Sequence, residues 1–178
     1  AVLDGKTLDP AVTRAILVVA RDVLKKADWS RLTPSLLDDV MDMAIDKVKE
    51  KISKKYISPV AKVANELIDE LKPTMNDLMH KEVGQDTIDK VRDVFLKALD
   101  NGIDGIDKGK SREDLLNTAR DDLLGLSPVV SAELKRIGAK AAESINQEMH
   151  DKVEAALPGV ILPDLIGDLI GNLAEDIV

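Results

Sequence analysis

The two histidines, His80 and His150, are the side chains best suited to metal binding or proton transfer near neutral pH. Di-metal sites in helical bundles use Glu-x-x-His on facing helices, because residues three apart share a face. The chain has Asp77-x-x-His80 and Gln147-x-x-His150, and a glutamine cannot supply the second carboxylate. We therefore interpret both histidines as surface or boundary residues, and we expect neither a metal site nor a cofactor.

A Gly/Asp-rich stretch that begins at Asp100 resembles an EF-hand calcium loop in part. With Asp100 at position 1, position 3 is Gly102 and position 12 is Ser111. A calcium loop needs an oxygen ligand at position 3 and a bidentate glutamate at position 12. We therefore predict that residues 102–110 form a flexible connection between helices and bind no calcium.

The sequence offers no nucleophile or phosphate loop of a known type. It has no cysteine, which excludes disulfides, a thiolate nucleophile and Cys-ligated zinc. Neither a G-x-x-x-x-G-K-[ST] phosphate loop nor a G-x-S-x-G elbow occurs. Carboxylates are plentiful but lie on helical faces that are ordinarily solvated, so none stands out as an acid or base. We identify no catalytic residue and expect that the protein is not an enzyme.

The charge balance argues against a nucleic-acid binder, since a net charge of −8 is opposite to the basic footprint of such proteins. One local exception is a lysine run around a single glutamate, Glu50. It contains Lys47, Lys49, Lys51, Lys54 and Lys55. We interpret this run as the solvated end of a helix, where lysines favour the helix dipole. The alternative is contact with anionic headgroups or an acidic partner.

The apolar residues predict an aliphatic core, because the chain has only one Trp, one Tyr and one Phe. No apolar run approaches the ~20 residues that span a bilayer, so we expect no transmembrane segment. The chain starts at Ala1 rather than Met, which removal of a signal peptide or trimming of a recombinant tag would explain. We expect a secreted or extracellular protein, with the cytoplasm as the alternative.

Polar-proline pairs predict helix starts. Asp9-Pro10, Thr33-Pro34, Ser58-Pro59 and Ser127-Pro128 each place a capping residue before a proline whose missing N–H would have had no partner. Apolar periodicity of 3.6 residues then predicts helices. Their approximate ranges are 10–27, 34–56, 59–72, 74–83, 86–101, 111–123, 128–157 and 163–177. The fold class expected is all-α: one domain over 1–178, a bundle of about seven to eight amphipathic helices.

Two of these helices carry long apolar stripes. In helix 10–27, Leu17 and Val18 widen a face that predicts a well-buried helix; that face consists of Val12, Ala15, Ile16, Val19 and Val23. In helix 128–157 the stripe runs along the whole length. It consists of Val130, Leu134, Ile137, Ala141, Ile145, Met149 and Val153.

Residues 160–178 are the element that we tie most directly to function. Seven aliphatic residues there share one face of a predicted helix: Leu162, Leu165, Ile166, Leu169, Ile170, Leu173 and Ile177. Such a face must dock on this domain, on a second copy or on a lipid-like surface. Gly167 and Gly171 weaken the isolated helix, so we predict a docked helix that can detach, with an ordinary core helix as the alternative. Trp29 is predicted to be partly packed beside a helix junction and to contact an apolar ligand.

Two functions remain open. The first is a non-enzymatic amphipathic protein, carrier- or surfactant-like, that binds lipids, hydrophobic ligands or apolar interfaces. The second is a structural or protein-interaction bundle that forms a homo-oligomer without a ligand. The aliphatic helix faces predict both equally, so bound lipid or a defined oligomer is the observation that separates them.

Overall fold

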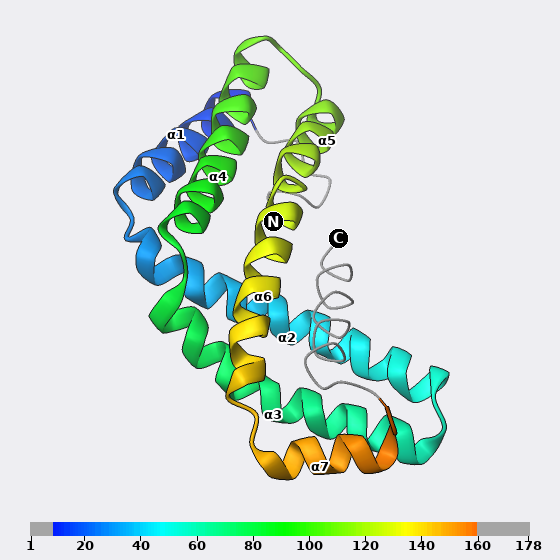
Figure 1. Cartoon of the computed structure of the whole chain (residues 1–178). Helices are drawn as coiled ribbons and strands as arrows, with labels where there is room; N and C mark the ends of the chain where they lie inside the picture. Colours follow the sequence, from blue (N-terminus) through cyan, green and yellow to red (C-terminus); the bar gives the residue numbers. More distant parts are fainter. Residues whose placement is uncertain (1–8, 160–178) are drawn as a thin grey trace. The chain divides into compact units, whose positions relative to one another are not determined.

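The computed structural model describes residues 9–159 and shows only α-helices in that range (Figure 1). There are seven of them: α1 (Pro10–Lys26), α2 (Trp29–Lys55), α3 (Ser58–Glu82), α4 (Gln85–Asp107), α5 (Arg112–Leu123), α6 (Leu126–Glu143) and α7 (Gln147–Ala156). The all-α prediction is confirmed. The predicted helix 163–177 lies outside the described residues.

The contacts divide the chain into two compact units. Unit 1 consists of Ala1–Trp29 and Asp89–Leu126, and it holds α1, most of α4, and α5. Unit 2 consists of Ser30–Ile88 and Ser127–Val178, and it holds nearly all of α2, with α3, α6 and α7. The single domain over 1–178 stays a prediction, and the two units are described separately below.

Unit 2 is built on an antiparallel hairpin of α2 and α3 (Figure 1). Three ion pairs join the two helices. The farther a pair lies from the turn, the larger is the sequence separation between its two residues, as an antiparallel pairing requires. They are Lys49 with Asp69, Lys72 with Asp42 at 3.1 Å, and His80 with Asp38 at 2.5 Å. The turn of this hairpin therefore lies at Tyr56 and Ile57, where α2 has ended and α3 has not begun.

The core of unit 2 is aliphatic, as predicted. Side chains from α2, α3 and α6 are fully or almost fully buried: Leu37, Met41, Val48, Leu67, Met75, Met79, Val130, Leu134 and Ile137. The predicted stripe of the last long helix is buried throughout, from Val130 to Val153. Helix α7 packs on α3, with Lys152 Nζ 3.7 Å from Glu66 Oε2.

Two prolines predicted to mark helix boundaries lie inside helices instead. The predicted start at Thr33-Pro34 is wrong because α2 begins at Trp29, and the predicted stop at Pro73 is wrong because α3 continues to Glu82. An internal proline removes one helical hydrogen bond and costs about 3 kcal/mol. Buried residues on both sides of each proline offset this cost, since most helical stability in proteins comes from packing.

The predicted helix 128–157 is also two helices. The chain leaves the helical path at Ser144 and starts again after Asn146, whose side chain accepts a hydrogen bond from the Met149 N–H at 3.0 Å. This Asn cap satisfies one of the free donors at the start of α7. The apolar spacing did not predict this break, because Ile145 within the break and Met149 after it are both buried.

Unit 1 has α1 and α5 packed along α4. Three polar contacts hold these helices: Arg14 Nε to Asp107 Oδ1 at 2.7 Å, Arg21 Nη1 to Asp100 Oδ1 at 3.3 Å, and Asn101 Nδ2 to Asp122 Oδ2 at 2.8 Å. The predicted caps are present at Asp9, which accepts from the Ala11 N–H, and at Ser111, which accepts from the Asp114 N–H. The start of α1 and the start of α5 are therefore as predicted.

The predicted connection over 102–110 is wrong, because α4 continues through it to Asp107. A Cβ on Gly102 would lie 3.2 Å from Leu17 of α1, and one on Gly105 would lie 2.6 Å from Leu115 of α5. These glycines let neighbouring helices approach closely rather than ending the helix. The turn comes later, at Gly109, which has φ +71°.

Candidate functional site

Helix α1 exposes the face that the sequence predicted to be buried. Val12, Ile16, Val19 and Val23 are 48%, 48%, 61% and 60% exposed, and no residue of α1 is buried. The prediction of a well-buried helix is therefore wrong. At ~100° per residue these four side chains lie within roughly 60° of one another. We call this set the α1 apolar face.

The exposure has a simple geometric cause. The apolar arc of α1 is wide, and α4 covers only the side that carries Leu17. Arg14 and Arg21 fix that side against α4 through their pairs with Asp107 and Asp100. The periodicity predicted that the arc is apolar but could not show that a single neighbour covers part of it.

The α1 apolar face is hollowed. An open hollow lies along it, lined by Ala11, Val12, Ala15, Ile16 and Val19. The two alanines leave space beside the larger side chains. The lining is almost entirely apolar, so it offers few hydrogen-bonding partners.

Trp29 is packed, as the sequence predicted. It is 7% exposed, its indole N–H donates to the Leu24 carbonyl at 2.7 Å, and its ring centroid lies 5.7 Å from that of Phe95. The hydrogen bond satisfies the one polar group of the side chain, so Trp29 closes unit 1 without needing a ligand. Its contact with an apolar ligand stays a prediction.

The other residues predicted to bind an apolar ligand lie outside the described residues. They are Leu162, Leu165, Ile166, Leu169, Ile170, Leu173 and Ile177. The detachable helix over 160–178 therefore stays a prediction.

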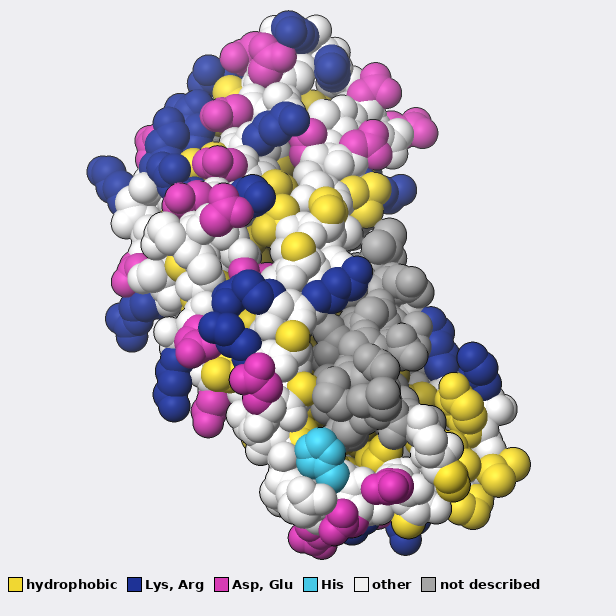
Figure 2. All heavy atoms as spheres, in the orientation of Figure 1, with side chains coloured by type: hydrophobic (Ala, Val, Ile, Leu, Met, Phe, Trp, Pro, Cys, Tyr) yellow, Lys and Arg dark blue, Asp and Glu magenta, His cyan; other side chains and the backbone are white. Residues whose placement is uncertain are grey.

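A second exposed apolar site lies at the turn between α2 and α3, and the sequence analysis missed it. Tyr56 and Ile57 are 46% and 73% exposed, and Lys55 Nζ lies 5.6 Å from the centre of the Tyr56 ring. Figure 2 shows hydrophobic side chains gathered where α2 meets α3, with basic side chains beside them. The signal was present, because two large apolar residues directly follow the lysine run.

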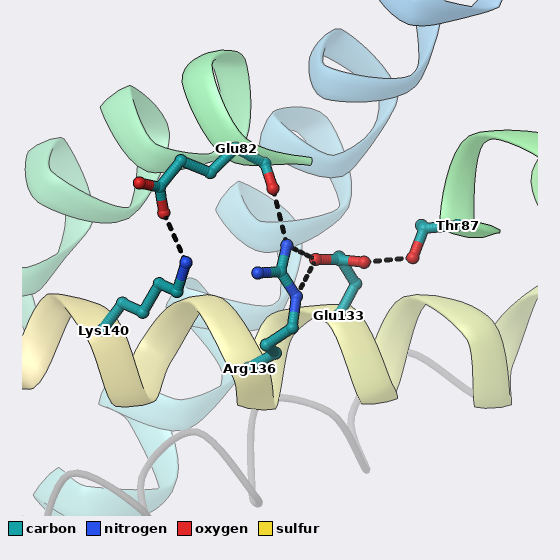
Figure 3. A network of polar contacts seen from close by, with 5 residues as sticks. All are labelled: Glu82, Thr87, Glu133, Arg136 and Lys140. Atoms are coloured by element: carbon teal, nitrogen blue, oxygen red, sulfur yellow. Dashed lines mark hydrogen bonds and ion pairs between the residues drawn. The ribbon is translucent and has the colours of Figure 1, made fainter. Parts of the chain in front are cut away.

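A polar network centred on the buried Glu133 joins α6 to the end of α3 and the start of α4 (Figure 3). Glu133, only 4% exposed, accepts hydrogen bonds from the Thr87 hydroxyl and from Arg136 Nε, the latter at 2.7 Å. Arg136 Nη2 also donates to the Glu82 carbonyl at 2.6 Å, which satisfies a free acceptor at the end of α3. Each carboxylate oxygen of Glu133 has a partner, so the arrangement is that of a structural network.

Neighbouring cations lower the pKa of three exposed carboxyl groups, Glu50, Glu82 and Asp107. The hydrogen bond from Lys140 to Glu82, with Nζ 2.9 Å from Oε2, and the charge of Lys140 lower the pKa of Glu82. The hydrogen bond from Arg14 lowers the pKa of Asp107 in the same way. These groups are stabilised as anions, which is the reverse of what a general acid needs near neutral pH.

The described residues contain no cluster of three side chains that could hold a metal ion. The aspartates of the rejected calcium loop contact cations instead, as with Asp104, which lies 2.9 Å from Lys108 Nζ. His80 pairs with Asp38 across the α2–α3 hairpin. Among residues 9–159, no helix combines the length and the apolar character needed to cross a bilayer.

The chain matches no protein-family description, no curated protein and no solved structure.

Proposed function

We propose that the protein is a non-enzymatic helical protein that binds lipid or another apolar surface through the α1 apolar face. The observation that supports this proposal is the exposure of Val12, Ile16, Val19 and Val23 along one side of α1. Single exposed apolar residues are normal on proteins, but a contiguous row of four is typical of an interaction site.

Covering the α1 apolar face with another apolar surface is energetically favourable. Full burial of a Val or Ile side chain stabilises by about 1.5–3 kcal/mol, so covering four half-exposed ones contributes roughly 3–6 kcal/mol before the cost of association. Lys25 and Lys26 lie in the last turn of α1, so the apolar row ends beside two basic side chains. An apolar row beside basic residues is the pattern of a helix that lies in the interface of a lipid layer.

The experiment compares binding of the wild-type protein and the variant Ile16→Ser/Val19→Ser to vesicles of neutral phosphatidylcholine. We expect the double substitution to weaken binding by about tenfold or more, since two aliphatic side chains are lost from the buried contact. Co-sedimentation with vesicles measures the bound fraction. Circular dichroism checks that the helices remain, which we expect because neither side chain contributes to the core.

Met43→Ser is the matched control, because Met43 is 67% exposed and lies on α2, so it is not part of the α1 apolar face. Its binding should equal that of the wild type. If the double variant binds like the wild type, the proposal is wrong. If the protein forms a defined oligomer that the double substitution dissolves, and no lipid binds, a second copy covers the face instead. Size exclusion with light scattering measures that outcome.

A further inference from the structure

We propose that the α2–α3 tip docks on an anionic lipid bilayer. The α2–α3 tip is defined by Tyr56 and Ile57 with the lysines that precede them, Lys54 and Lys55. This inference rests on the proposed function in taking lipid as the occupant, but it concerns a different surface and a different lipid charge.

The shape of the tip suits a surface rather than a pocket. The ion pairs across the hairpin show that α2 and α3 run antiparallel, so their connection stands at the end of both helices. Ile57 is the most exposed of the large apolar residues described, and neither α2 nor α3 includes it. An apolar residue at the end of a helical hairpin can enter the headgroup region without any rearrangement of the helices.

The side chains around Ile57 are those that favour a membrane interface. Tyr56 combines an apolar ring with a polar hydroxyl, which suits the boundary between acyl chains and headgroups. Lys55 lies over the Tyr56 ring, so its apolar stem is near the tip while its charge can reach the headgroups.

The positive charge around the tip favours binding to an anionic surface. Residues 47–62 hold six lysines and one glutamate, a net charge of +5 in a chain whose net charge is −8. Lys49 and Lys54 pair with Asp69 and Glu50, yet these pairs leave the segment strongly basic. The rest of the chain is acidic and would be repelled by an anionic bilayer, so the tip is the part that can approach it.

A lipid bilayer accounts for more features of the α2–α3 tip than an acidic protein partner does. An acidic partner would account for the lysines but would leave Ile57 in water or demand a matching pocket. A bilayer accepts both features at once, because its headgroups take the lysines and its acyl boundary takes the apolar side chains.

The test compares binding to vesicles of phosphatidylcholine alone with binding to vesicles of equal parts phosphatidylcholine and phosphatidylserine. The full chain should bind the anionic vesicles more tightly, and added salt should reduce the difference. The variant Lys54→Gln/Lys55→Gln should lose about 25-fold in affinity for anionic vesicles, at about fivefold for each lysine near the surface. Ile57→Ser should lose about tenfold.

The controls lie outside both proposed lipid-binding surfaces. Lys108→Gln/Lys110→Gln removes two lysines from the turn that follows α4, which is part of neither the tip nor the α1 apolar face. We expect this control to lose less than about twofold in affinity. Met43→Ser controls for the loss of an exposed apolar side chain on the same hairpin and should bind as the wild type does.

Three results would overturn the inference. Equal losses from the two lysine pairs would show a general charge effect, with no role for the tip. Loss of binding from the lysine variant but none from Ile57→Ser would indicate an acidic macromolecule as the partner. Equal binding to anionic and neutral vesicles would also contradict docking of the tip on an anionic bilayer. In that case the proposed function would still stand if Ile16→Ser/Val19→Ser lost binding to neutral vesicles.

Discussion

Replacing Arg136 with methionine is expected to lower the free energy of unfolding of unit 2 by about 3 kcal/mol, because it leaves the buried carboxylate of Glu133 without its cation. The substitution also removes the hydrogen bond to the Glu82 carbonyl at the end of α3. Urea unfolding followed by far-ultraviolet circular dichroism measures the change. Arg136 is partly exposed, so we expect the lower end of the range that buried pairs show.

The second substitution in this experiment is Glu133→Leu in the Arg136→Met background. Because the buried charge is then absent, the double variant should be more stable than Arg136→Met alone. The Thr87 hydroxyl loses its acceptor in the double variant, which costs about 1 kcal/mol and keeps its stability below that of the wild type. Equal or lower stability of the double variant would show that the uncompensated charge of Glu133 is not what destabilises Arg136→Met.

Truncating Leu134 to alanine is expected to destabilise unit 2 by about 3–4 kcal/mol. Leu134 has no exposed surface and lies among the buried side chains of α2, α3 and α6. The loss combines the transfer free energy of the removed atoms with the cavity left behind. The urea concentration at the midpoint of unfolding should fall, while the slope of the unfolding free energy against urea concentration stays the same.

Val19→Ala is the matched control for Leu134→Ala, since it also shortens an aliphatic side chain on a helix. Val19 is on the α1 apolar face, so we expect a change within about 0.5 kcal/mol. A loss at Val19 as large as that at Leu134 would mean that the α1 apolar face is packed against protein, and it would remove the basis of the proposed function.

Much of the fold could be predicted from sequence because apolar period and capping chemistry are local. The stripe from Val130 to Val153 is buried as predicted, and Asp9 and Ser111 cap α1 and α5 as predicted. These features depend on residues within a few positions of one another, so the sequence carries them directly.

The helix boundaries at Pro34, Pro73 and Gly102 were wrong for a shared reason. Proline and glycine weaken a helix locally, but packing from distant residues decides whether it continues. Because Gly102 and Gly105 have no side chains, Leu17 and Leu115 can pack close to the backbone of α4. Both leucines lie far from these glycines in sequence. Glu133 is similar, because nothing in its neighbourhood predicts a buried carboxylate with Thr87 as a partner.

The candidate site could likewise be predicted only in part from the sequence. The sequence predicted the apolar face of α1, but only the structure shows that α4 leaves part of it uncovered. The lysine run was recognised as the end of a helix, while the exposure of Tyr56 and Ile57 depends on the antiparallel pairing of α2 with α3.

Hydrogen–deuterium exchange of α1 with and without neutral phosphatidylcholine vesicles tests most directly whether lipid covers the α1 apolar face. No side chain of α1 is buried, so its amides should exchange readily in the free protein. We predict that vesicles slow exchange over residues 12–23 and that the effect disappears in Ile16→Ser/Val19→Ser. Exchange in α1 that is unchanged while vesicles bind, or that slows with protein concentration in the absence of lipid, would contradict the proposal.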